Sequence, residues 1–331
     1  MQYAVLGRTG IRVSRLAFGA GPVSGLMTGR GYRMQRSTVE RAIQAGLNWF
    51  DTAAGYGNGS SEKNLGRVLR ELPSAGTATV HIATKVRIHP ERPQDIPAQI
   101  GQSVDGSLRR LRVRFLTLLQ LHNGVTRKRG DEPDSISVGD VLGPRGVADA
   151  FRRLKQEGMI RFMGLTGTGC PESLREVIRS GAFDAIQLPF NILNPSAGQR
   201  MPDGFREQDY GCILEDCREQ GLGVFAIRVF AGGALLGRPP GTHTLKTPYF
   251  PLDLYERDLR LAAELQRKNP NVPLPRQALH FALGHPAVHS AIIGFGAPEH
   301  VDAAVRDLAA CAAAAAWPLS IGGSGIDNRT D

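Results

Sequence analysis

NWFDTAAGYGNGSSEKNLG, residues 48–66, joins a strand, a loop and the start of a helix, and it sets the pattern for the rest of the chain. Residues 48–53 form a short, largely apolar run with two aromatic side chains, which is typical of a strand buried on both faces. Gly, Asn and Ser then predict a loop, and from Ser61 the apolar residues recur at helical spacing. Asp51 and Tyr56 therefore lie at the carboxyl end of a strand. Taken alone, the first could be a turn residue and the second a surface aromatic.

The same order of strand, loop and helix recurs along the chain. Residues 3–13 alternate around two glycines and predict a small hairpin. Eight short apolar strands are then expected at residues 15–21, 48–53, 80–86, 115–122, 162–167, 185–190, 224–229 and 291–295. Helices are expected from residue 61 and at 38–45, 97–111, 147–157, 172–180, 210–220, 254–267, 275–284 and 298–310. This pattern predicts an α/β protein with a parallel sheet covered on both faces, and eight strands favour a (β/α)8 TIM barrel formed as one domain by residues 1–331.

Three long polar loops are predicted, at residues 123–144, 191–208 and 238–253, and the sequence does not assign their role. Each follows a strand, on the face of a barrel where chemistry takes place. The tail, about residues 312–331, loses its periodicity and is expected to be irregular.

Composition is ordinary for a globular protein of 331 residues, with 41% hydrophobic and 21% charged residues. The net charge of +9 could suit a polyanion, but the arginines are scattered along helices, so we expect no nucleic acid partner. The four cysteines, 170, 212, 217 and 311, form no CxxC pair, so we expect buried reduced thiols, no metal site and a cytoplasmic protein. The chain start has no apolar export segment, and no stretch is long and apolar enough for a membrane span.

Three consecutive predicted strands end in polar residues that an apolar core would not select: Asp51, Lys85 and His122. In a parallel barrel these strand ends are neighbours. A lysine ammonium helps a nearby phenol to release its proton, and the Asp51 carboxylate would keep Lys85 charged. Tyr56 could then act as a general acid, and His122 could donate a hydrogen bond to a carbonyl oxygen. The alternative is a structural ion pair beside a core histidine.

Several motifs resemble the aldo-keto reductase superfamily, and the resemblance runs over roughly the whole chain: DTAAGYG with SEKNLG, ATKV, LLQLHN, MGLTG, AIQLPF and IIGFGAPEH. It implies the same barrel and a nicotinamide dinucleotide bound without a Rossmann motif. It also implies Tyr56 as the general acid and base, Lys85 and Asp51 as the pair that tunes it, and His122 as the residue that orients the substrate. The absence of a GxGxxG fingerprint agrees, because GAGPVSG at residues 19–25 has neither its spacing nor its helix.

The cofactor residues are expected at the carboxyl ends of the strands. AGGALLG, residues 231–237, and the helix that starts within GFGAPEH, residues 294–300, would form a barrel phosphate site, although the glycines could also be simple tight turns. The resemblance implies that Gln187 and Thr166 hold the nicotinamide carboxamide, while Arg228 could reach the pyrophosphate or be a paired arginine. The predicted cofactor residues are Gly19, Thr166, Gln187, Arg228, Gly232, Gly294, Phe295, Gly296 and His300.

The choice between NAD and NADP depends on the 2′-phosphate. NADPH-using relatives commonly present basic residues and an asparagine where this chain has Gly294, His300 and Ala304. This weak clamp favours NAD. The GLTG segment is also similar to the branch that contains NAD-linked galactose, arabinose and fucose dehydrogenases.

Together these features predict an NAD(P)-dependent oxidoreductase that transfers hydride between nicotinamide and an aldehyde, ketone or sugar carbon. One alternative is a lyase that forms a Schiff base on Lys85. Another is a regulatory subunit that binds the dinucleotide with little turnover. The sequence leaves the substrate, the physiological direction and the oligomeric state open.

Overall fold

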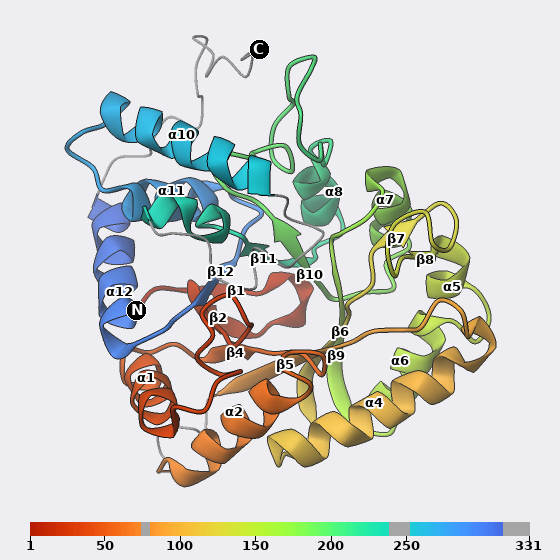
Figure 1. Cartoon of the computed structure of the whole chain (residues 1–331). Coiled ribbons are helices and arrows are strands. Elements are labelled where there is room, and N and C mark those ends of the chain that lie inside the picture. Colours follow the sequence, from red (N-terminus) through yellow and green to blue (C-terminus); the bar gives the residue numbers. More distant parts are fainter. Residues whose placement is uncertain (74–79, 238–251, 314–331) are drawn as a thin grey trace.

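The computed structural model describes residues 1–73, 80–237 and 252–313. Eight parallel strands close into a barrel, and helices surround it (Figure 1). In order around the barrel the strands are β3 (Leu16–Gly19), β4 (Trp49–Asp51), β5 (His81–Val86), β6 (Leu116–Leu121), β9 (Ile160–Thr166), β10 (Ala185–Pro189), β11 (Gly223–Ile227) and β12 (Ser290–Gly294). The prediction of a closed (β/α)8 barrel is therefore confirmed.

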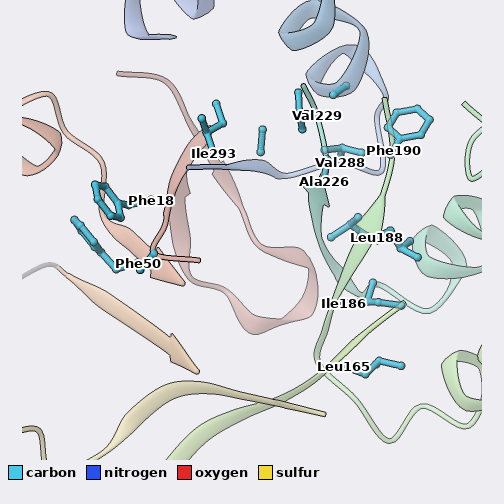
Figure 2. Close-up of a cluster of buried hydrophobic side chains, with 14 of the residues drawn as sticks. Phe18, Phe50, Leu165, Ile186, Leu188, Phe190, Ala226, Val229, Val288 and Ile293 are labelled. Atoms are coloured by element: carbon cyan, nitrogen blue, oxygen red, sulfur yellow. The ribbon is translucent and has the colours of Figure 1, made fainter. Parts of the chain in front are cut away.

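The side chains of the strands alternate between the inside and the outside of the barrel. Phe18 and Phe50 project outward from neighbouring strands and stack with ring centroids 5.2 Å apart (Figure 2). Ile186 and Leu188 belong to the same outer cluster, which packs between strands and helices. The outer layer is apolar, and so is the part of the inner layer at the amino ends of the strands, which explains why most of each strand segment lacks polar alternation.

The amino-terminal hairpin lies at the amino ends of the strands. It pairs β1 (Tyr3–Val5) with β2 (Arg12–Ser14), as predicted, and the 3-10 turn η1 (Gly7–Thr9) connects them. Its apolar side chains share one buried cluster with residues from inside the barrel: Leu6, Ile11, Val13, Ala17, Trp49, Ala83, Leu118, Ala185 and Phe225. This cluster fills the lower half of the barrel and leaves the carboxyl ends of the strands for polar groups.

The helices agree with the expected order. Their bounds are α1 (Tyr32–Gln44), α2 (Ser60–Glu71), α4 (Ile96–Leu111), α6 (Val147–Gln156), α7 (Pro171–Arg179), α8 (Ile213–Glu219), α10 (Leu252–Lys268), α11 (Leu274–Gly284) and α12 (Pro298–Ala313). The expected start of α1 at residue 38 was wrong, because its polar first turn carries no apolar periodicity. That turn is held instead by buried Gln35, which donates to the carbonyls of Leu26 and Gly29 at 3.0 and 2.9 Å.

The segment 123–144 is not the simple loop that was predicted. It contains the parallel pair β7 (Val125–Thr126) and β8 (Ile136–Ser137), followed by α5 (Val138–Leu142). Ser137 and Asp140 form a capping box at the start of α5. Such short elements are fixed by side-chain hydrogen bonds and therefore leave no periodic pattern in the sequence.

Some expectations about single residues also need correction. Cys217 is buried as expected, but Cys170 and Cys212 are half-buried and precede α7 and α8. The helix expected from residue 210 begins only at Ile213. The predicted loop 238–253 and tail 312–331 lie almost entirely outside the described residues. Among the helices that are described, none is both long and apolar enough to cross a membrane.

Candidate active site

The polar residues inside the barrel lie two positions further along each strand than the residues of its apolar inner cluster. Residues two apart on a strand share a face. Because Trp49 and Ala83 belong to the inner cluster, Asp51 and Lys85 also point into the barrel. The same step leads from Leu118 to Gln120 and from Ala185 to Gln187 on the strands β6 and β10. A Cβ on Gly164 would lie 2.9 Å from the Gln120 side chain, so this glycine on β9 makes room for the polar layer.

Asp51 is the centre of this layer. Its Oδ2 atom forms an ion pair with the ammonium of Lys85, and its Oδ1 atom accepts hydrogen bonds from Gln120 at 3.1 Å and from Gln187. Lys85 also donates to the carbonyl of Thr52 at 2.9 Å. Burial by itself would lower the pKa of Lys85, but Asp51 and then Tyr56 outweigh it, so the pKa is raised. The lysine is therefore protonated at neutral pH.

Tyr56 lies on the loop between β4 and α2. Gly57 and Gly59 adopt positive φ angles of 56° and 82°, which turn the chain sharply into α2. Buried Ser61 fixes the loop to the barrel by donating to the carbonyl of Ala20 at 2.8 Å. The phenol oxygen accepts a hydrogen bond of 3.3 Å from Lys85. Its own proton is therefore available to a group in the space above the barrel.

His122 follows β6 and faces Tyr56. The two rings meet edge to face, with centroids 5.6 Å apart and planes at 81°. Burial lowers the pKa of His122 well below its usual value, and the positive charges of Lys85 and Arg87 lower it further. The imidazole is therefore neutral at neutral pH and can donate one hydrogen bond. Asp51, Lys85, Tyr56 and His122 thus lie together at the carboxyl end of the barrel, as the spacing of the strands predicted.

A cavity of about 350 Å³ opens above these residues. Tyr56, Lys85 and His122 lie in its wall, together with Thr166, Gln187 and Arg228 from the set of predicted cofactor residues. The remaining wall contains both apolar and polar side chains, and its polar residues come mainly from two of the three segments whose role the sequence did not assign: Asn123, Glu132, Asp134, Asn191, Asn194, Glu207, Gln208 and Tyr210.

The carboxamide end of a nicotinamide fits the groups at this wall. The Nε2 atom of Gln187 donates to Asp51, and the hydroxyl of Thr166 donates to the carbonyl of Leu121 at 3.1 Å. The amide oxygen of Gln187 and the lone pairs of the Thr166 oxygen remain, and a carboxamide NH2 group needs acceptors. Both residues can therefore hold such a group as acceptors.

A further polar group lies at the predicted binding site for the phosphates of the dinucleotide. The hydroxyl oxygen of Ser24 is buried and has no hydrogen-bond partner within the described residues. A Cβ on Gly294 would lie 3.7 Å from this oxygen, so the hydroxyl lies directly beside the end of β12. An unsatisfied O–H donor at this position suits a phosphate oxygen. Sequence reasoning missed Ser24, because one serine in the loop after β3 gives no distinctive signal.

Four other predicted cofactor residues have structural partners of their own. A Cβ on Gly19 would lie 3.0 Å from Ile292, so this glycine permits close packing of β3 on β12. Phe295 is buried and packs against Phe18 with ring centroids 5.5 Å apart. Gly296 donates its amide to the Nδ1 atom of His300 at 3.1 Å, at the start of α12. Neither this amide nor Nδ1 is then free to donate to a phosphate in this arrangement.

Arg228 and Gly232 follow β11. Arg228 adopts a left-handed backbone with φ 58°, which is strained for a side chain of this kind. Burial lowers the pKa of its guanidinium, although Asp258 and Tyr210 favour the charged form. Gly232 adopts φ 67° within η3 (Ala231–Leu236) and produces the kink in that turn. Neither residue belongs to a simple surface loop.

Gln120 is the site residue that the sequence could have revealed but did not. It stands in the apolar segment LTLLQL two positions before His122, so the period of the strand places both on the inner face. A buried amide in an otherwise apolar strand requires a polar partner.

Comparisons with known proteins identify the family of this chain and agree with its fold. The model of the aldo/keto reductase family matches residues 15–312. L-galactose dehydrogenase of Arabidopsis thaliana is 25% identical over 93% of this chain and 89% of its own length. D-threo-aldose 1-dehydrogenase of a Pseudomonas species is 25% identical over 88% of each protein. The structure of aldo-keto reductase AKR11C1 from Bacillus halodurans, holo form, matches with a TM-score of 0.68 and 24% identity over 93% of this chain and 91% of that one.

The family match includes all eight barrel strands and every residue of the polar layer described above. The chain therefore belongs to the aldo/keto reductase family, whose members are oxidoreductases.

Proposed function

We propose that this protein is an NAD(P)-dependent oxidoreductase that transfers hydride between nicotinamide and the carbonyl carbon of an aldehyde, ketone or aldose. The observation that carries the proposal is the position of the Tyr56 phenol, which accepts a hydrogen bond from protonated Lys85 and lies edge to face with neutral His122 at the wall of the cavity. A bound nicotinamide would supply or accept the hydride.

The roles of the residues follow from their hydrogen bonds. Tyr56 gives its proton to the carbonyl oxygen during reduction and takes it back during oxidation. Lys85 stabilises the negative charge that Tyr56 acquires when the proton leaves, and Asp51 keeps Lys85 protonated. His122 donates its N–H to the same oxygen and orients the carbonyl group. Asp51 itself is fixed by Gln120 and Gln187, so the ammonium has one position.

The same ion pair argues against a Schiff-base mechanism. A lysine nucleophile must be neutral to attack a carbonyl. The pKa of Lys85 is raised by Asp51 and Tyr56, and its ammonium already donates to three oxygen atoms. Lys85 therefore supports proton transfer at Tyr56 better than covalent catalysis.

The proposed dinucleotide lies across the carboxyl end of the barrel, with its carboxamide at Thr166 and Gln187 and its phosphates near Ser24. We propose NAD(H) rather than NADP(H), because Gly294 carries no side chain and the Nδ1 atom of His300 is an acceptor. The carboxylate of Glu299, in the first turn of α12, further disfavours the 2′-phosphate of NADP(H).

A sugar or a related hydroxyaldehyde is the proposed substrate class, since two relatives are named for L-galactose and D-threo-aldoses. Polar side chains in the cavity wall, among them Asn123, Asn191 and Asn194, can form hydrogen bonds with the hydroxyl groups of such a substrate. We further propose that residues 1–331 act as one barrel domain in the cytoplasm.

Tyr56→Phe tests the proposal. Proton transfer typically contributes about 10² to 10⁴ in rate, so turnover of aldehydes with NADH should fall by that factor while the dinucleotide Kd stays within a few fold. Tyr3→Phe is the matched control, because Tyr3 is exposed and its hydroxyl donates to Gly46 at 3.0 Å, far from the cavity. Near-normal turnover by Tyr56→Phe would remove the proposed mechanism.

A further inference from the structure

Three carboxylates within the described part of the chain line the cavity: Glu132, Asp134 and Glu207. Asp134 forms an ion pair with Arg87 at 2.6 Å. Glu207 contacts Arg257 through one oxygen and accepts from Asn194 at 3.1 Å through the other. The carboxylate of Glu132 receives no hydrogen bond or ion pair from any described residue. Glu132 therefore differs from the other two in having both oxygens available to a ligand.

The backbone around Glu132 is firmly held. The amide of Glu132 donates to the Ser135 hydroxyl at 3.0 Å, and the amide of Ser135 donates back to the Glu132 carbonyl at 3.0 Å. Ser135 is fully buried, and Thr126 donates to its hydroxyl at 2.8 Å. Asn123, directly after His122, donates to the carbonyl of Asp134 at 2.7 Å. The turn that carries Glu132 is thus tied to the strand end that carries His122.

Partial burial of the Glu132 carboxylate has a free-energy cost, which hydrogen bonds from a ligand would offset. Glu132 is half-buried, and burial followed by the charge of Asp131 raises its pKa. Its charge also acts on Tyr210, another residue of the cavity wall whose pKa is raised mainly by burial. A partly buried carboxylate without a partner loses hydration that nothing in the described protein replaces. A ligand that donates hydrogen bonds would replace it.

The charges of the wall indicate a neutral ligand. Lys85 pairs with Asp51, Arg87 with Asp134 and Glu207 with Arg257. The other two charged residues that line the cavity, Glu132 and Arg228, have opposite charges. A cationic or an anionic substrate would disturb this balance, because it would bury a charge that the wall does not compensate. Hydroxyl groups, by contrast, donate to a carboxylate without adding charge, and each hydrogen bond to a charged group is strong.

We propose that Glu132 is a specificity-determining residue whose carboxylate accepts hydrogen bonds from hydroxyl groups of a neutral, polyhydroxylated substrate. The proposal rests on the proposed function and adds to it the residue that distinguishes a sugar from a simple aldehyde. It predicts that the hydroxyl groups next to the reacting carbonyl face the turn formed by residues 132–135.

Kinetics with matched aldehydes provide the first test. The ratio of kcat/KM for glyceraldehyde to that for propanal, both with NADH, should be well above one for the wild type. Glu132→Gln should lower this ratio about tenfold or more, equivalent to about 1.4 kcal/mol, with the loss mainly in KM for glyceraldehyde. Asp131→Asn is the matched control, because Asp131 is the adjacent exposed carboxylate, lies outside the cavity wall and accepts from the Lys128 amide at 2.8 Å. An unchanged ratio in Glu132→Gln overturns the proposal.

A binding measurement keeps the test independent of turnover. In the Tyr56→Phe background, saturation-transfer NMR with arabinose, glucosamine and glucuronate should show binding of the neutral sugar, and Glu132→Gln should weaken that binding about tenfold or more. Equal arabinose affinity with and without Glu132→Gln overturns the proposal, as does a loss confined to glucosamine, which would mark a cation site. If the wild type turns over neither aldehyde, the proposed function fails, whereas this arm still decides the role of Glu132.

Discussion

Replacing Lys85 by Met removes the cation from the most buried ion pair of the described residues, whose side chains are 1% and 4% exposed. Breaking a buried pair typically costs about 3 to 5 kcal/mol, because the remaining charge has lost its partner. Gln120 and Gln187 still donate to Asp51 in this variant, which places the cost near the lower end. Loss of the bond to the Thr52 carbonyl adds about 1 kcal/mol. We therefore expect a loss of about 4 kcal/mol and no turnover.

A double-mutant cycle isolates the pair. Asp51→Asn should also destabilise the protein by several kcal/mol, since it leaves the Lys85 ammonium buried without its counter-ion. The double variant should lose about 2 kcal/mol less than the sum of the single variants, because contacting residues are not additive. Urea unfolding followed by circular dichroism at neutral pH gives each free energy. Single losses below about 1 kcal/mol, or losses that simply add, would refute the reasoning.

The pH dependence of this contribution has a definite sign. The pKa of Lys85 is raised above its unfolded value, so the stability that it contributes is fully present below about 10.4. It is lost as the pH rises through the higher folded pKa. The difference between wild type and Lys85→Met should therefore be constant around neutral pH and shrink only in strongly alkaline solution.

Two further predictions concern other parts of the site. Equilibrium titration should show NAD(H) bound at least as tightly as NADP(H), and His300→Arg should shift the preference toward NADP(H) by about tenfold, or 1.4 kcal/mol; a wild-type preference for NADPH of roughly a hundredfold would contradict the weak clamp. Burial raises the pKa of Asp258 to about 6, with Glu207 adding to the effect and Arg257 opposing it. Its contribution to stability is thus complete below about pH 4 and falls by about 2 to 3 kcal/mol as the pH rises to the folded pKa. Urea unfolding of Asp258→Asn should lack this fall, and parallel pH curves for the two proteins would show the expectation to be wrong.

The barrel was readable from the sequence because its strands are buried on both faces. Eight largely apolar segments alternate with helical patterns, and the charged or ionisable residues Asp51, Lys85 and His122 lie at or near strand ends. Local spacing was sufficient for these three residues because consecutive parallel strands are neighbours in the barrel. The first turn of α1 was missed because its determinant, Gln35, acts through a side-chain contact with the preceding loop.

The remainder of the site depends on contacts between distant segments. Gln187 donates to Asp51 across 136 positions of sequence, and no local pattern reveals such a pair. Ser24 and Glu132 are informative only because their side chains have no hydrogen-bond partner among the residues that the structure describes. A sequence shows which residues are polar, but it does not show which of them remain unsatisfied after folding. The proposed cofactor contacts stay predictions for the same reason.

The alternation of inner and outer side chains also limits how this protein can vary over evolutionary time. Deleting one residue from β5 ahead of Lys85 would turn the lysine toward the helices and point Val86 at Asp51, because neighbouring strand residues face opposite sides. Insertions and deletions should therefore be excluded from the eight strands in any lineage that retains the chemistry. Length changes will be concentrated in the segments after β6 and β10, where a longer or shorter chain alters the cavity wall and leaves the polar layer in register.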